Sequence, residues 1–202
     1  VFFFSCSDIN NNDISPFNFL PPESEVILNI NNLNNTKEIL SKNKNLSNIS
    51  SSKNKILNQL NSLSKKKSNN SGLLSLTPFG KNQIAYTYIR ETNTQDSISK
   101  SDIEKGEYQK NKIFIDTTLL KDVYKTILGK YIISSNEDII LENIIRDYNR
   151  TKIDSDFFKL LRAADKNVPF NTFSIRKKSG FMIKNQSIKL LELIHQVHQW
   201  IY

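Results

Sequence analysis

The apolar residues of this chain fall into short runs of strand length, and this spacing constrains the fold more than any other feature. Runs of this kind, bounded by glycine, proline or polar residues, favour β-strands. The expected strands cover residues 26–30, 73–76, 84–89, 112–116, 123–128, 131–133 and 170–175. Between two of them, residues 92–110 carry charges of both signs, and we expect a polar loop there. No run reaches the roughly 18 apolar residues of a membrane-spanning helix.

Several other segments repeat apolar residues every three or four positions, which is typical of helices with one buried face. These segments cover residues 36–49, 53–65, 140–148, 154–164 and 188–201. Thr36 is the expected N-cap of the first, and residues 134–138 place hydroxyl groups and acids at the start of the third. We therefore predict an α+β fold, with a mixed or antiparallel sheet and helices packed on one face.

The positive charge is concentrated in two parts of the chain. The 202 residues carry a formal charge of +8, with +7 in residues 41–71 and +5 in residues 151–202. The first of these blocks ends with Lys65, Lys66 and Lys67, and no aromatic residue lies between Phe19 and Phe79. Nucleic-acid grooves interleave basic and aromatic side chains, so this block does not favour nucleic-acid binding. The lysines are either a solvated helix face or a contact with anionic lipid headgroups.

The standard signatures of catalytic and metal sites are missing from the sequence. Five glycines and one cysteine exclude a glycine-rich nucleotide scaffold, a disulfide framework and a cysteine-based zinc site. His195 and His198 are three residues apart, but no second group of ligands accompanies them, so we interpret them as exposed helix residues. We therefore name no catalytic residue, no metal ligand and no cofactor.

The single cysteine follows an apolar segment rich in phenylalanine. Residues 1–5 read Val-Phe-Phe-Phe-Ser and lead directly into Cys6. Residues 3–6 resemble the lipobox of bacterial lipoprotein signals, although Phe4 stands where a smaller residue is usual. The resemblance implies cleavage before Cys6 and lipidation of its thiol by a diacylglyceryl group, usually with a further acyl chain on its amino group. The alternative is a free thiol packed as a small apolar side chain.

Two further segments resemble a poorly characterised family of bacterial envelope lipoproteins. Residues 22–28 read Pro-Glu-Ser-Glu-Val-Ile-Leu, a Pro-Glu motif that runs into an apolar strand. Residues 131–136 read Tyr-Ile-Ile-Ser-Ser-Asn, a strand that leads to a helix start. The resemblance covers about residues 20–175. It implies an α+β domain in the envelope, but it supplies no catalytic residues.

These features predict a lipid-anchored protein of the bacterial cell envelope. Residues 1–5 are then the remnant of a signal peptide, residues 6–18 a polar tether, and residues 19–202 one α+β domain, truncated at its C-terminal end if the chain is part of a longer protein. We expect anchoring in the outer membrane rather than the inner one, through acyl chains on Cys6, and a binding or structural role with a protein partner in the envelope. The alternatives are the N-terminal fragment of a larger envelope hydrolase and a basic cytosolic RNA-binding protein.

Overall fold

The computed structural model of the protein describes residues 14–42, 57–61, 71–81, 83–92, 102–117, 122–148, 168, 170–176 and 180–184. The helical elements are the short 3-10 helix η2 (Pro16–Phe19) and the α-helices α1 (Leu33–Lys42) and α3 (Asp138–Tyr148). Residues 57–61 are also helical. The strands are β1 (Val26–Ile30), β2 (Gly72–Phe79), β3 (Gln83–Glu91), β4 (Asp102–Tyr108), β5 (Asn111–Asp116), β6 (Val123–Leu128), β7 (Tyr131–Ser135), β8 (Phe170–Arg176) and β9 (Gly180–Lys184).

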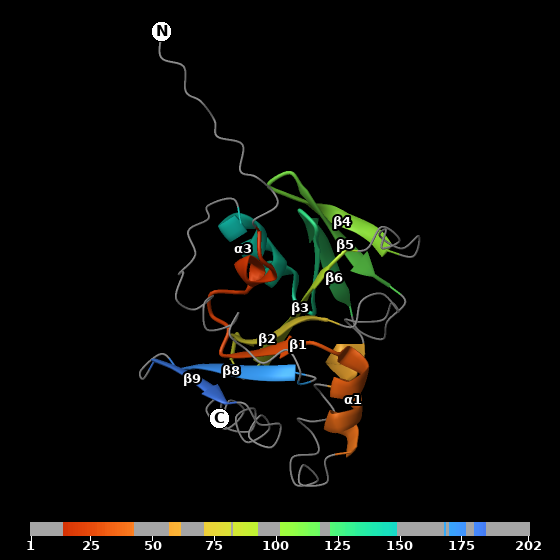
Figure 1. Cartoon of the computed structure of the whole chain (residues 1–202). Helices are drawn as coiled ribbons and strands as arrows, with labels where there is room; N and C mark the ends of the chain where they lie inside the picture. The colour runs from red at the N-terminus through yellow and green to blue at the C-terminus, as the bar shows by residue number, and fades with distance from the viewer. Residues whose placement is uncertain are drawn as a thin grey trace.

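The described strands form one sheet in which every neighbouring pair is antiparallel (Figure 1). Its order is β4-β5-β6-β7-β3-β2-β1-β8-β9, so β2 and β3 lie near the centre and β4 lies at one edge. The expected α+β class and the antiparallel sheet are confirmed. None of the helices that the structure describes has the length and apolar character needed to cross a membrane.

The two α-helices pack against opposite faces of the sheet. Because side chains alternate along a strand, β2 directs Leu74 and Leu76 to one face and Leu73 to the other. Leu74 and Leu76 share a core with residues of α1, and we call this the α1 face. Leu73 shares a core with residues of α3, and we call this the α3 face. The expectation of helices on one face is therefore not met, because a central strand buried on both sides needs cover on both sides.

Helix α1 begins earlier than the sequence pattern suggested. Its first residue is Leu33, and Thr36 lies inside the helix, where its hydroxyl donates to the carbonyl of Asn32 at 2.6 Å. Asn32 occupies the capping position, since its side-chain oxygen accepts a hydrogen bond from the Asn35 N–H at 3.0 Å. Thr36 is fully buried, as expected for a residue on the packed side of the helix rather than at its end. The expected N-cap at Thr36 was wrong by one helical turn.

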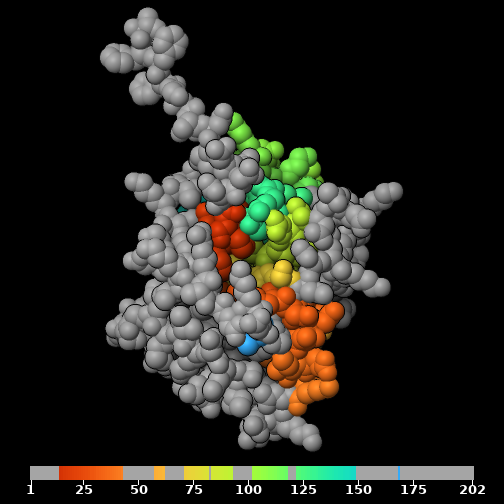
Figure 2. All heavy atoms as spheres, in the orientation of Figure 1, coloured from red at the N-terminus to blue at the C-terminus, as the bar shows by residue number. Residues whose placement is uncertain are grey.

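The chain enters the folded part before residue 19. Ser15 caps η2, Phe19 is completely buried, and Phe17 packs against the core of the α3 face. The carbonyl of Ile14 accepts a hydrogen bond from the Tyr131 hydroxyl at 3.0 Å. In Figure 2 this first described segment is the red area at the surface of the molecule. Residues 14–18, which we expected to belong to the polar tether, are therefore part of the domain.

Most expected strands are confirmed, but the polar loop at 92–110 is a correction. Residues 102–108 of that segment form β4, which pairs with β5. Its five central residues are all exposed, so β4 has no buried face to produce an alternating apolar pattern. The expected helices at 154–164 and 188–201, and most of the one at 53–65, lie outside the described residues.

Candidate functional site

Neither of the sites expected from the sequence can be located in the described part of the fold. Cys6 and the three lysines Lys65, Lys66 and Lys67 all lie outside the described residues, as do His195 and His198. What the structure brings together instead are two groups of charged side chains, one on each face of the sheet near β4. Both groups are candidate sites.

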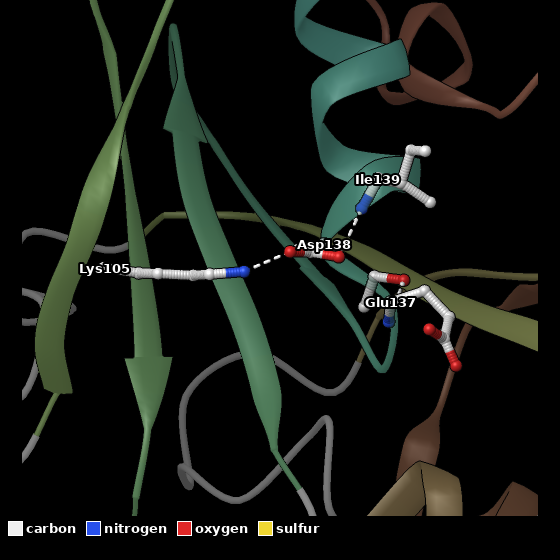
Figure 3. Close-up of polar contacts among 5 residues, drawn as sticks. Lys105, Glu137, Asp138 and Ile139 are labelled. Atoms are coloured by element: carbon white, nitrogen blue, oxygen red, sulfur yellow. Dashed lines mark hydrogen bonds and ion pairs between the residues drawn. The ribbon is translucent and has the colours of Figure 1, made fainter.

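The first group links β4 to the start of α3 across the α3 face. The ammonium of Lys105 pairs with the Asp138 carboxylate and lies over the Tyr124 ring, 4.5 Å from its centroid. Figure 3 shows Lys105 extending from its strand toward Asp138, whose other oxygen accepts the Ile139 N–H at 2.8 Å. We call Lys105, Tyr124 and Asp138 the Lys105 cluster. A cation over an aromatic ring and an acid at a helix start are both favourable arrangements.

The electrostatics of this cluster follow from its ion pair. The hydrogen bond from Lys105 lowers the pKa of Asp138, and the same bond raises the pKa of Lys105. Partial burial, together with the nearby Asp138 charge, raises the pKa of Glu137. The two adjacent carboxyl groups are therefore shifted in opposite directions. Such a split can support acid–base chemistry in an active site, but it also arises in structural ion pairs.

The second group lies on the α1 face, where three charged residues of neighbouring strands meet. Asp102 of β4 stands directly opposite Asp116 of β5, and Lys125 of β6 contacts both. The Lys125 nitrogen lies 2.9 Å from an Asp102 oxygen and 2.8 Å from an Asp116 oxygen. The Asp102 and Asp116 side chains are 3% and 8% exposed, so their charges are largely removed from water. We call these three residues the Lys125 cluster.

The chemistry open to the two clusters is charge compensation. Two carboxylates directly opposite each other on paired strands repel, and the ammonium between them offsets this repulsion. Within the described residues, no group of three or more histidine, cysteine, aspartate or glutamate side chains is arranged to hold a metal ion. Each ammonium instead occupies the space beside the carboxylates where a cation would sit. The geometry therefore assigns both clusters to the support of β4.

Sequence reasoning missed both clusters because they depend on strand register. Asp102 and Asp116 become neighbours only when β4 pairs with β5, and β4 was interpreted as a loop. One local signal was available at Lys125. It shares its strand face with Val123, which is buried, so a charged residue there required a partner. The sequence does not show which acid supplies that partner.

No protein-family model, curated protein or solved structure matches this chain.

Proposed function

We propose that this chain is a lipid-anchored protein of the bacterial cell envelope, with a binding or structural α+β domain. The observation that carries the proposal is Cys6, the chain's single cysteine, placed directly after a Phe-rich segment that ends in Ser5. Lipidation through a thioether requires a cysteine with apolar and small residues before it. Residues 1–4 are apolar and Ser5 is small, although Phe4 is larger than the residue usual at its position. The lipobox-like residues and the resemblance to envelope lipoproteins both support this location.

The start of the described fold is compatible with an anchor close to the domain. Ile14 is the first described residue, and the Tyr131 hydroxyl holds its carbonyl against the sheet. Residues 7–13, which separate Cys6 from Ile14, are polar except for Ile9. A single acyl chain binds a membrane marginally and two or three bind it stably, so the full lipoprotein modification would hold the domain near the bilayer surface.

The proposal includes a second contact with the membrane through Lys65, Lys66 and Lys67. A basic residue close to an anionic surface contributes about 1 kcal/mol, so three adjacent lysines add usefully to an acyl anchor. The test is vesicle binding of the lipidated protein, with Lys65, Lys66 and Lys67 replaced by glutamine. We expect weaker binding to vesicles of anionic lipid and no change with neutral vesicles. Equal binding of both proteins to anionic vesicles would overturn this contact.

The domain is proposed as a binding or structural module rather than an enzyme. In the described residues, the charged groups near β4 form ion pairs with neighbouring strands and with α3 instead of converging on a reactive side chain. We propose anchoring in the outer membrane, which separation of the two membranes by density would test. Recovery of the protein with the inner membrane would contradict this part of the proposal.

The decisive experiment is metabolic labelling with an alkyne fatty acid. The full-length precursor is expressed in a bacterial host beside Cys6→Ala, with Ser7→Ala as a matched control next to the same site. We expect the unchanged protein and the Ser7→Ala variant to carry label and to fractionate with membranes, and Cys6→Ala to lose both properties. Label that persists in Cys6→Ala, or no label in the unchanged protein, would overturn the proposal.

A further inference from the structure

Strand β4 buries fewer of its side chains than β1–β3 and β5–β7 do. Of its apolar side chains, Ile103 is 58% exposed, and Tyr108 is only partly buried against the core of the α3 face. By contrast, Ile113 of the neighbouring strand β5 is buried and belongs to that core. Burial of apolar surface is the main force that fixes a strand in a sheet, and β4 makes little use of it.

Charge pairs fix β4 on both faces of the sheet instead. On the α1 face, Asp102 pairs with Lys125, and Glu104 pairs with Lys112 at 2.8 Å. On the α3 face, Lys105 pairs with Asp138. These contacts reach β5, β6 and α3, so β4 is linked electrostatically to three different elements. The Glu104–Lys112 and Lys105–Asp138 pairs are largely solvent-exposed and therefore sensitive to salt.

The backbone of the β4–β5 hairpin also carries local irregularities. The register shifts between Glu104 and Gly106, which marks a β-bulge in the edge strand. The turn residues Gln109 and Lys110 have φ angles of 46° and 65°, in the left-handed region that favours glycine or asparagine. Both features weaken the hairpin relative to an ideal one, as expected for an element that can separate from its neighbours.

We propose that β4 is a releasable edge strand, which leaves β5 as a unit while the rest of the sheet stays folded. The Lys125 cluster is built for both states. With β4 in place, Lys125 contacts two carboxylates, and after release it keeps Asp116 while Asp102 moves into water. The buried ammonium is therefore compensated in either state. Release would expose the edge of β5, whose backbone groups could then pair with another strand.

The experiment is amide hydrogen exchange of the whole chain, followed residue by residue. It compares the amides that pair β4 with β5 and the amides that pair β2 with β3. Asp102→Asn removes a contact to Lys125 that exists only while β4 is paired with β5. We therefore expect all β4–β5 amides to lose protection together by about tenfold. Leu74→Ala weakens the core that stays folded after β4 is released. It should therefore lower the protection of the β2–β3 amides and leave that of the β4–β5 amides unchanged.

Two further measurements test the proposal even if one of these variants does not fold. Asp116→Asn removes the partner that Lys125 keeps after release, so β2–β3 amides should lose protection while β4–β5 amides do not. For the unchanged protein, raising salt from about 0.05 M to about 0.5 M should lower β4–β5 protection several-fold through screening. Lys81→Gln, in the exposed turn between β2 and β3, is the control and should change neither set.

The proposal would be overturned if Leu74→Ala lowered the protection of both sets equally, because β4 would then separate only with global unfolding. It would also be overturned if Asp102→Asn affected only the amides nearest residue 102, because that result means fraying rather than release. Salt-independent protection of the β4–β5 amides would contradict the role given to the charge pairs.

Discussion

The hairpins β2–β3 and β4–β5 share an antiparallel geometry but are stabilised by different forces. β2 and β3 lie near the centre of the sheet and bury apolar side chains on both faces, such as Leu74 and Tyr88 on one and Leu73 and Ile89 on the other. β4 lies at an edge, exposes Ile103 and is held by ion pairs. The comparison shows that one continuous sheet can combine a rigid centre with an edge whose attachment depends on charge.

The largest expected difference between the hairpins comes from truncating an aliphatic side chain in each. Leu74→Ala removes a fully buried side chain and should lower the free energy of unfolding by about 3 kcal/mol, from lost burial and the cavity left behind. Ile103→Ala, on the exposed face of β4, should change it by about 0.5 kcal/mol or less. Urea denaturation measures both. Equal losses for the two variants would break the comparison.

The next effect concerns the lysine that compensates two buried carboxylates. Lys125→Met leaves Asp102 opposite Asp116 without the ammonium between them, so the free energy of unfolding should fall by about 2 kcal/mol. Lys112→Met breaks the exposed pair with Glu104 and is the matched control, with an expected loss of about 0.5 kcal/mol. Thermal or urea unfolding measures both. If both variants lost the same small amount, Lys125 would have no special role.

The smallest effect is on titration near the start of α3. Because Lys105 lowers the pKa of Asp138, this pair contributes stability that is present above the ordinary aspartate pKa and lost as pH falls through the lowered folded pKa. Lys105→Met should move the Asp138 midpoint upward, measured by NMR of the carboxyl carbons. The pKa of Glu137 should lie above the ordinary glutamate value in the unchanged protein, because burial is the main cause of its shift. An Asp138 midpoint that does not respond to Lys105→Met would contradict the pairing.

The same contrast explains what could be predicted from the sequence. Strands with a buried face, such as β1 and β3, could be predicted from their runs of apolar residues. Helix α3 could be predicted from apolar residues spaced three or four positions apart. Strand β4 did not, because its exposed side chains follow no apolar alternation. The Lys125 cluster was invisible because it exists only in the register that pairs Asp102 with Asp116. The Thr36 cap was misassigned because a polar residue in a helix interior looks like a cap until its burial is known.

The most direct test of this difference between the two hairpins is hydrogen exchange of the unchanged protein over a series of low denaturant concentrations. The opening free energy of an amide depends weakly on denaturant when its opening exposes little surface. It depends strongly on denaturant when the amide exchanges only through global unfolding. We predict that the opening free energy of the β4–β5 amides is low and nearly independent of denaturant, while that of the β2–β3 amides falls steeply. A single steep dependence shared by both hairpins would contradict the account, because β4 would then be held as firmly as the centre of the sheet.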